Sequence, residues 1–475
     1  MSGQVIYLFV NKSGTAEFRL FDVNQRGFFI YSAIKINKKE RYEFMSKSNE
    51  YELEKVPQDM KRGWIAMFSI LMAVGVDLSS VLLGAELASG MSMKNGILSV
   101  IVGSFFMAIL YTICAVVGSS TSLSVSMITK NVFGEQGAKV FSIVIALSLL
   151  GWFGVQVGFF AENAQIIIKE ITGISVSMPL LSLIGGLLMM STAIVGYKAM
   201  EKLSVYSVPF LVILIGITLF LAIGKYGINP IETETGNMSF AAGVSLSMSI
   251  GIVGAIISPN ISRWAKSNKD CVMASFFGML IGNSFMIIIS IVLIKIMGIA
   301  DIMKMFIVLG LGIPGIIVLT LAQWTTNTGN IYSSSLSMSI ILRNIPIKKI
   351  SFTLGIIATM LAVFGIYNQF VGFLNLLGII IAPVGGIYTS EFYVIKEKFT
   401  NSNEYNQKTN LSAICAWIIG IIITYMATPS PTGLGIISIT SIAPLDGFMT
   451  GFVSYAILSK SRSFINEKYL NKVVD

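Results

Sequence analysis

The stretch GWIAMFSILMAVGVDLSSVLLGAELASG (Gly63–Gly90) is long enough to cross a membrane, yet glycine, aspartate and serine interrupt it near its middle. A second stretch, FAAGVSLSMSIGIVGAIISPN (Phe240–Asn260), is interrupted in the same way by glycines and serines. Lipid offers no partner to a freed backbone N–H or C=O, so an unwound segment survives only where it lines a protein-enclosed cavity or binds a solute. Two interruptions five spans apart are typical of a transporter built from inverted repeats, with its binding site near the middle of the bilayer.

The composition of the chain is that of an integral membrane protein. Hydrophobic residues make up 54% of its 475 residues and charged residues 12%, with a mean hydropathy of +0.78; soluble domains carry about 25% charged residues. The formal net charge of +9 is spread over short loops and tails instead of one patch. This distribution favours the lipid bilayer as a partner and excludes nucleic acid.

The absence of histidine excludes several classes of enzyme. No Ser-His triad, HExxH zinc site or imidazole proton relay can form without it. An aspartyl protease would need membrane aspartates in YD and GxGD contexts, whereas Asp77 lies in GVDLSS and Asp446 in PLDGF. The sequence therefore predicts no enzyme and no cofactor. Cys114, Cys271 and Cys415 show no metal-ligand spacing and are interpreted as small core residues.

Apolar runs of about 17 to 25 residues predict a polytopic protein of twelve transmembrane helices. These runs lie near 63–90, 96–118, 138–164, 178–196, 203–224, 240–258, 271–297, 311–338, 351–367, 369–394, 411–428 and 432–458. With the N-terminus inside, the inner loops carry thirteen Lys and Arg residues and the outer loops five. This imbalance predicts a cytoplasmic-membrane protein with cytoplasmic N- and C-termini. The basic segment Pro259–Asp270 is predicted to lie along the inner membrane interface.

The two ends of the chain differ from the predicted transporter domain at 63–458. Residues 1–62 are predicted to be a cytoplasmic tail, because the β-like runs Val5–Val10 and Phe28–Ile36 are too short for a stable domain. Met45 opens a polar tail of its own, so we predict that the preceding 44 residues, 1–44, come from an upstream start codon; the alternative is a small cytoplasmic cap. Residues 459–475 are predicted to form a cytoplasmic C-terminal tail.

Asp77 lies near the middle of the first interrupted span, between Gly75 and the pair Ser79 and Ser80. A carboxylate at the centre of the bilayer costs about 2.5 to 3.5 kcal/mol on insertion scales, so it should face the protein interior. We interpret Asp77 as part of a substrate or cation site. The alternative is a structural aspartate that caps the broken half-helix or pairs with a buried lysine or arginine.

Trp152 and Gln156 in the third span are four residues apart and therefore share one helical face. A flat heterocycle needs an aromatic face for stacking and an amide that can donate and accept hydrogen bonds. The alternative for Trp152 is packing or anchoring at the membrane interface. In the sixth span, Ser249 and Gly251 stand where an uninterrupted helix would prefer leucine; the alternative for them is close packing between helices.

The eighth span contains LAQWTTNTGNIYSSS, in which Ala322, Thr325 and Thr326 share a face. Two neighbouring hydroxyls, together with carbonyls from a broken neighbouring helix, form the all-oxygen environment that a small hard cation requires. This face is therefore a predicted cation site.

Four segments together resemble the nucleobase:cation symporter family of the purine-cytosine permease type, whose members are cytosine, purine, uracil, thiamine, allantoin and hydantoin permeases. The resemblance is strongest to the bacterial cytosine permeases. The segments are GWFGVQVGFFA (Gly151–Ala161), ISRWAKSNK (Ile261–Lys269), GLGIPGIIVLTLAQWTTNTGNIYSSSL (Gly310–Leu336) and NQFVGFLNLLGIIIAPVGGIYTSEFY (Asn368–Tyr393). The similarity runs in order from about Gly63 to the last span, and the WTTN and APVGG motifs are the most specific.

The resemblance implies an all-α LeuT-type fold of two inverted five-helix repeats with discontinuous first and sixth helices. The first repeat would cover 63–224 and the second 240–394, followed by two extra helices at 411–458. It also implies that Trp152 stacks on the substrate ring and that Gln156 hydrogen-bonds the edge of the ring.

A sodium site of this family would use backbone carbonyls and hydroxyls of Ala73, Val76, Ala322, Thr325 and Thr326. The chain departs from the cytosine permeases at three positions, since these have asparagine at Ala322 and aromatic residues near Gly251 and at Asp77. Relatives of the hydantoin type tolerate alanine at Ala322, where a backbone carbonyl can serve.

These features predict a secondary active symporter that imports a nucleobase or a related heterocycle, of cytosine or purine type, with Na⁺ or H⁺. The alternative is a symporter of the same fold for another small solute, such as an amino acid, which would not require Trp152 and Gln156. An ion channel would need a ring-forming filter motif, and none is visible. A monomer is compatible with this mechanism.

Overall fold

A computed structural model describes residues 4–10, 16–24, 27–36 and 55–474, except 76–77, 196, 232–235, 340, 343, 401–407 and 438. The chain divides into two compact units, Met1–Lys55 and Val56–Asp475.

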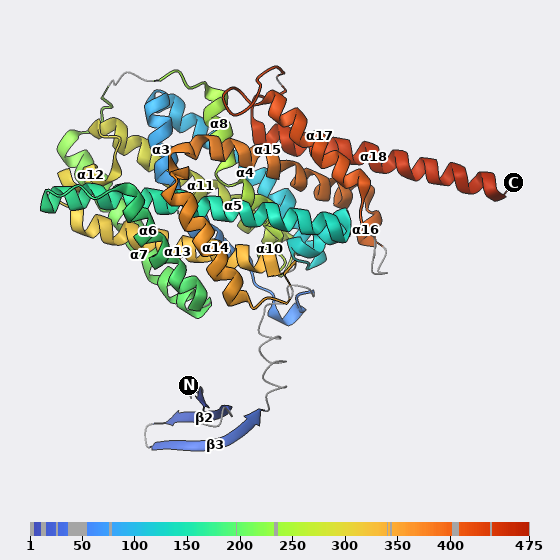
Figure 1. Ribbon diagram of the computed structural model, residues 1–475, viewed down its shortest axis with the longest axis horizontal. Helices are drawn as coiled ribbons and strands as arrows, with labels where there is room; N and C mark the ends of the chain where they lie inside the picture. Colours follow the sequence, from blue (N-terminus) through green and yellow to red (C-terminus); the bar gives the residue numbers. More distant parts are fainter. Residues whose placement is uncertain are drawn as a thin grey trace. The chain divides into compact units, whose positions relative to one another are not determined.

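The first unit contains a three-stranded antiparallel sheet of β1 (Gln4–Val10), β2 (Ala16–Asn24) and β3 (Gly27–Ile36), in the order β1-β2-β3 (Figure 1). Strands β1 and β3 correspond to the two β-like runs recognised in the sequence, and β2 pairs with both of them. The prediction of an all-α fold therefore applies to the second unit.

The second unit is helical. Its helices are α2 (Trp64–Gly75), α3 (Leu78–Gly90), α4 (Met93–Thr121), α5 (Val125–Thr172), α6 (Met178–Val195), α7 (Tyr197–Tyr226), α8 (Phe240–Ser249), α9 (Ile252–Ile256), α10 (Pro259–Ser262), α11 (Asn268–Met297), α12 (Ile302–Val308), α13 (Gly312–Ser339), α14 (Ile347–Val363), α15 (Phe370–Ser390), α16 (Glu397–Thr400), α17 (Leu411–Ala427) and α18 (Ala443–Val474). Three short turns are η1 (Gln58–Met60), η2 (Ile366–Gln369) and η3 (Glu391–Ile395). In the described part of the chain, four helices are long and apolar enough to cross a membrane on their own: α4, α5, α11 and the continuous stretch Ile366–Ile395.

The first eleven predicted spans each overlap a helix or a pair of helices, but the twelfth differs at both ends. Helix α18 begins at Ala443 instead of residue 432, because the preceding loop contains Pro429, Pro431 and Gly435, the last with a φ of 61°. A proline has no N–H for a helical hydrogen bond, and a positive φ ends a helix. The helix then continues to Val474, through the predicted C-terminal tail.

The sixth span is discontinuous, as predicted, whereas the predicted break of the first span falls at 76–77, outside the described residues. Helix α2 ends at Gly75 and α3 begins at Leu78, with 76–77 between them outside the described residues. Helix α8 ends at Ser249, and α9 begins after Gly251. A Cβ on Gly251 would lie only 2.7 Å from the Met107 side chain of α4, so glycine lets α4 approach the break.

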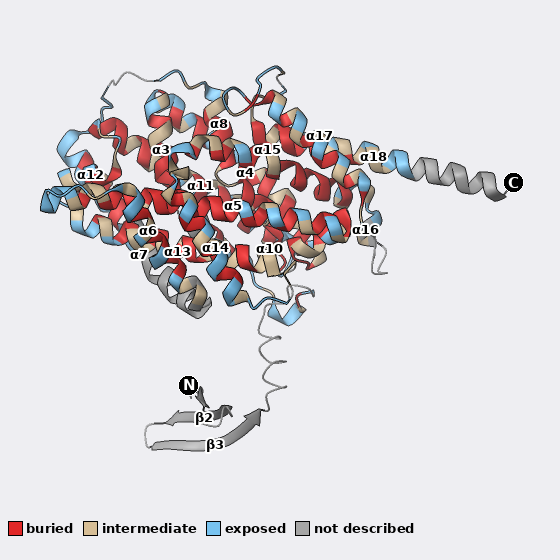
Figure 2. Cartoon of the chain, in the orientation of Figure 1, coloured by how far each residue is buried: buried red, intermediate tan, exposed pale blue. Residues whose placement is uncertain are grey.

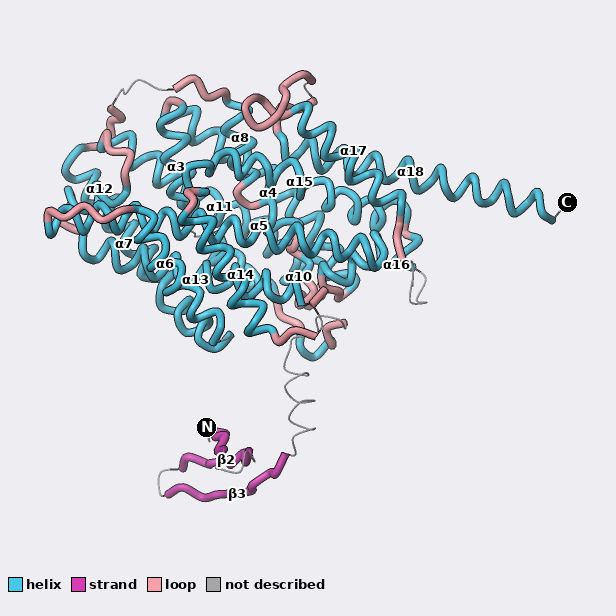
Figure 3. Tube along the Cα trace, in the orientation of Figure 1, coloured by secondary structure: helices cyan, strands magenta, loops and turns pink. Residues whose placement is uncertain are grey.

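Helices α5 and α15 run through the interior of the second unit, and Figure 2 shows buried residues concentrated along them. Helix α13 packs on α5, α11 packs on α4 and α2, and α15 packs on α18. The loops lie at the two ends of the bundle, and Figure 3 shows the loop between α17 and α18 near the start of α8. A hydrogen bond of 3.2 Å from the Ala443 N–H to Ser245 Oγ joins α18 to α8 there.

The segment before α2 is joined to the segment between α10 and α11, and we call this end of the bundle the tied end. The Arg62 N–H donates to the Trp264 carbonyl at 2.7 Å, and the Lys266 N–H donates to the Arg62 carbonyl at 2.8 Å. The first part of the predicted interfacial segment Pro259–Asp270 is buried, because Ser262 donates its hydroxyl to a backbone carbonyl of α4. Only its second part is exposed as predicted for an interface.

Candidate functional site

The opposite end of the bundle contains a cavity of about 1140 Å³, which we call the vestibule. Its wall combines α3, α8, the start of α15 and the loop between α17 and α18. The lining residues used below are Leu82, Glu86, Ser245, Tyr367 and Phe370. A cavity between the two broken helices fits the position expected for a solute pathway in an inverted-repeat transporter.

A second cavity of about 240 Å³ adjoins the vestibule, and Leu82, Glu86 and Tyr367 line both. The Tyr367 hydroxyl donates a hydrogen bond to the Glu162 carboxylate of α5. The Tyr367 ring also stacks on Phe159, with ring centroids 6.0 Å apart and planes 8° apart. This tyrosine therefore forms part of the partition between the two cavities.

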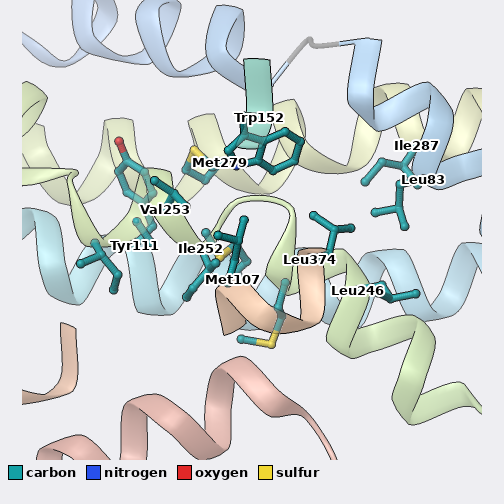
Figure 4. Packing of buried hydrophobic residues seen from close by; sticks show 14 of the residues in the cluster. Leu83, Met107, Tyr111, Trp152, Leu246, Ile252, Val253, Met279, Ile287 and Leu374 are labelled. Atoms are coloured by element: carbon teal, nitrogen blue, oxygen red, sulfur yellow. The ribbon is translucent and has the colours of Figure 1, made fainter. Parts of the chain in front are cut away.

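Trp152 lies below the vestibule, in the packed centre of the second unit. Its ring contacts Phe370 at 6.3 Å and Phe373 at 5.4 Å between centroids, edge to face in both cases. Figure 4 shows the Trp152 indole beside Met279 in the same apolar cluster as Ile252 of α9. Neither of the two cavities described is lined by Trp152, because Phe370 lies between it and the vestibule.

Gln156 is buried one turn further along α5, where its Nε2 donates to Ser79 Oγ of α3 at 3.3 Å. This hydrogen bond joins the predicted ring-binding face of α5 to α3, the second helix of the first span. Asp77, two residues before Ser79, lies outside the described residues, as does Val76.

Ser249 ends α8 at the second break, and it is completely buried. Its hydroxyl has no hydrogen-bond partner among the described residues and lies 3.2 Å from the position of a Cβ on Gly378 of α15. Ser249 therefore faces α15, and Gly251 faces α4 through Met107. The structure brings both residues to the break, but it gives neither a direct contact with Trp152.

Three of the predicted cation ligands lie within hydrogen-bond distance of one another on α13. The hydroxyls of Thr325 and Thr326 donate to the Ala322 carbonyl at 2.7 and 3.1 Å. Ala73 lies in the last turn of α2, where backbone carbonyls lack intrahelical partners and carry the negative end of the helix dipole. Hydroxyl and carbonyl oxygens are the ligands that a small hard cation takes.

Three residues that the structure places around the predicted ring site, Phe370, Phe373 and Ser79, were not among the predicted site residues. Phe370 and Phe373 lie in the segment Asn368–Tyr393, and their spacing of three puts both rings on one face of α15. Ser79 was noted only as a neighbour of Asp77. The aromatic spacing was a usable signal, whereas the partner helix of each residue was not visible in the sequence.

A broken sixth span, a polar face on α13 and a vestibule leading toward a buried tryptophan indicate the class of protein: a membrane transport protein. A family model described as "Permease for cytosine/purines, uracil, thiamine, allantoin" matches residues 55–456, and the chain belongs to this family. The cytosine permease of Escherichia coli (strain K12) is 28% identical over 419 residues, which cover 87% of this chain and 95% of that protein.

Two solved structures share the fold. The inward-facing conformation of Mhp1 gives a TM-score of 0.75 at 15% identity and covers 86% of this chain and 93% of its own. Mhp1 in a closed conformation with bromovinylhydantoin bound, a nucleobase-cation-symport-1 family transporter, gives 0.72 at 15% identity, with 87% and 95% covered. The family resemblance is thereby confirmed, and the LeuT-type fold is supported; the count of twelve membrane crossings stays a prediction. The relatives are permeases and not enzymes.

Proposed function

We propose that this permease is a secondary active symporter that imports a nucleobase or related planar heterocycle, of cytosine or purine type, together with Na⁺ or H⁺. The observation that carries the proposal is the position of Trp152 and Gln156, which lie at the junction of α5 with the broken spans and directly below the vestibule. The family description and the names of the relatives support the substrate class.

Substrate recognition follows from the chemistry of these two side chains. Trp152 offers a stacking face, and an offset or edge-on aromatic pair contributes about 0.5 to 1.5 kcal/mol beyond burial. Gln156 offers an amide that both donates and accepts. The rings of Phe370 and Phe373 already pack on Trp152, so a substrate would enter by displacing Phe370 toward the vestibule. In this way α15 replaces the aromatic wall that the sixth span lacks at Gly251.

The coupling cation would bind between α2 and α13. Its proposed ligands are the backbone carbonyls of Ala73, Val76 and Ala322 and the hydroxyls of Thr325 and Thr326. A cation held by both helices would fix the broken first span against α13 and favour the state open at the vestibule. One positive charge entering along the membrane potential releases about 2.3 kcal/mol per 100 mV. This energy supports roughly a fortyfold substrate gradient, since 1.4 kcal/mol is a factor of ten.

In this proposal the tied end faces the cytoplasm and the vestibule faces outward, in agreement with the distribution of lysine and arginine in the loops. Asp77 would accept a hydrogen bond from an amino-substituted ring, contribute to the cation site or carry a proton. Asp77→Asn separates these roles, because unchanged uptake and unchanged ion dependence would remove Asp77 from the mechanism.

The test is a thermal-shift screen of the purified full chain against nucleobases, hydantoins and amino acids, with and without Na⁺. A ring that binds should stabilise the fold by about 2.7 kcal/mol when its free concentration is a hundred times its Kd. Na⁺ should add to this effect. Thr326→Val should lose only the Na⁺ increment. The matched control Thr328→Val should keep it, because Thr328 makes the same kind of bond to its own helix, at the Trp324 carbonyl, but is not a predicted ligand and lies about 160° around α13 from Thr326. Stabilisation by an amino acid and by no heterocycle would refute the proposal.

A further inference from the structure

Gln323 on α13 is completely buried, and neither its amide nitrogen nor its amide oxygen has a hydrogen-bond partner among the described residues. A primary amide has two N–H donors and a carbonyl with two lone pairs. Buried polar groups in native proteins nearly always have partners, because an unmade hydrogen bond costs the desolvation of the group. The partner of this amide is therefore expected to be something other than the described protein atoms.

The direction of the Gln323 side chain follows from its neighbours on α13. Successive residues of a helix are about 100° apart, so Gln323 lies about 60° from Thr326 and about 40° from Asn327. Asn327 Nδ2 donates to the Phe153 carbonyl of α5 at 3.4 Å. Thr326 lies on the face of the predicted cation ligands. Gln323 therefore points into the sector between α5 and that face.

The depth of Gln323 follows from the antiparallel register of α13 and α5. Near the other end of the pair, a Cβ on Gly312 of α13 would lie 3.3 Å from Ile167 of α5. The number of residues from Gly312 to Asn327 on α13 is nearly the same as the number from Ile167 to Phe153 on α5. Gln323 is consequently level with Val157 of α5, which follows Gln156 directly.

We propose that Gln323 contacts the transported ring and helps to determine which rings are accepted. At this level Gln156 of α5 is already bonded to Ser79 of α3, and Gln323 adds a second amide from a third helix. A primary amide pairs at two points with a lactam or amidine edge, in which an N–H stands beside a C=O or a C=N. The substrate class is thus a planar heterocycle with such an edge. This inference rests on the proposed function.

The experiment uses the full chain in lipid nanodiscs and compares the wild type with Gln323→Leu. The probes are cytosine, uracil and hypoxanthine. Each is compared with an analogue methylated at every ring N–H that stands beside a C=O or a C=N, and affinity is measured by calorimetry. Gln323→Leu should weaken binding of the unmethylated ring roughly tenfold or more, since two hydrogen bonds are lost. The methylated analogue should bind both proteins within about a factor of two. Thr328→Val, a buried polar-to-apolar change on the same helix, should bind like the wild type.

A second measurement distinguishes contact with a ligand from a structural role. The unfolding temperature of ligand-free Gln323→Leu should equal or exceed that of the wild type, because the change removes a buried amide with no protein partner. A structural role would instead lower it. If the wild type binds a ring and Gln323→Leu binds it equally well, the amide holds only trapped water and the inference is overturned alone. If the wild type binds none of these rings, the proposed function and the inference both fail.

Discussion

The two ends of the helical unit differ in what holds their helices together. At the tied end, hydrogen bonds cross between segments far apart in sequence: Arg62 with the Trp264 and Lys266 backbone, and Tyr388 with the Ile256 carbonyl. At the vestibule end, the described contacts between α5 and the start of α15 are mainly aromatic, and cavities of about 1140 and 240 Å³ lie among them. Hydrogen bonds between distant segments also occur at the vestibule end, as between Ala443 and Ser245, but there α5 and the start of α15 are held mainly by aromatic contacts beside open space.

This difference indicates which change the transport cycle requires. Each intramolecular hydrogen bond contributes about 0.5 to 1.5 kcal/mol net to stability. A few such bonds at the tied end therefore favour the present state by several kcal/mol. Reversing a two-state population from 1:99 to 99:1 needs about 5.5 kcal/mol. The bonds of the tied end are thus in the energy range that substrate and cation binding can overcome. The following variants test this comparison of the two ends, from the largest expected effect to the smallest.

Phe370→Ala should have the largest effect, because it removes the ring between the vestibule and Trp152. Phe370 is only 4% exposed, and truncating a buried phenylalanine costs about 3 to 5 kcal/mol. The unfolding temperature should fall. Iodide should also quench more of the tryptophan fluorescence, and this increase should disappear in the double variant with Trp152→Phe.

The control for this variant is Phe364→Ala, two residues before η2, since that ring is 82% exposed and packs little. It should change neither the unfolding temperature nor the quenching. Quenching that stays at the wild-type level in Phe370→Ala would show that Phe370 is not the partition between the vestibule and Trp152.

Gly118→Ala should disrupt the tied end. A Cβ on Gly118 of α4 would lie 2.5 Å from the Pro259 Cα and 2.4 Å from Ser262 Oγ, so α10 would have to move away. Overpacking of this kind costs about 1 to 3 kcal/mol. Labelling of the buried Cys114 and Cys271 by a soluble maleimide should become faster in a Cys415→Ser background, because Cys415 is exposed.

Gly329→Ala is the matched control, since a Cβ on this glycine of α13 would meet nothing within 4 Å. Alanine is the better helix former by about 1 kcal/mol, so this variant should be at least as stable as the wild type. Equal stability and equal labelling of the two alanine variants would contradict the close contact between α4 and α10.

The sequence was sufficient for features that depend on local pattern. Apolar runs located the spans, and glycine and serine at mid-length located the break of the sixth span, because a break needs residues that tolerate an unwound backbone. The start of the twelfth span was wrong by eleven residues, because the loop before Ala443 is itself rich in isoleucine and contains few charges. Hydropathy alone does not distinguish such a loop from a helix.

Contacts between distant segments were beyond the reach of pattern. Phe370 packs on Trp152, which lies 218 positions earlier in the chain, and no periodicity within either helix indicates the other as its partner. The burial of Ser262 has the same origin, since its acceptor is the Ala115 carbonyl of α4. The segment Pro259–Asp270 has the composition of an interfacial helix, and only the tertiary fold covers its first part.

Asp270→Ala should loosen the tied end by a smaller amount. The Asp270 carboxylate accepts from the Trp64 N–H at the start of α2 at 3.2 Å and from the Ser267 hydroxyl at 2.6 Å. Loss of a helix cap costs about 1 kcal/mol, so labelling of Cys271 should become roughly fivefold faster. The control is Asp301→Ala, which removes the cap of α12, far from α2. The Asp301 carboxylate accepts from the Met303 and Lys304 N–H groups of α12. Equal acceleration by both variants would argue against a specific role of Asp270 in holding α2.

Tyr367→Phe should have the smallest effect, because it removes one hydroxyl group and keeps the aromatic ring. The change removes the hydroxyl that donates to Glu162 but keeps the stacking of the ring on Phe159. Glu162 lines the smaller cavity, so water can replace the lost donor and the cost should be about 0.5 kcal/mol. The unfolding temperature should fall only slightly, as in the exposed control Tyr226→Phe. A fall as large as that of Phe370→Ala would mean that a side-chain hydrogen bond, and not aromatic packing, holds α15 to α5, so that the two ends are fastened in the same way.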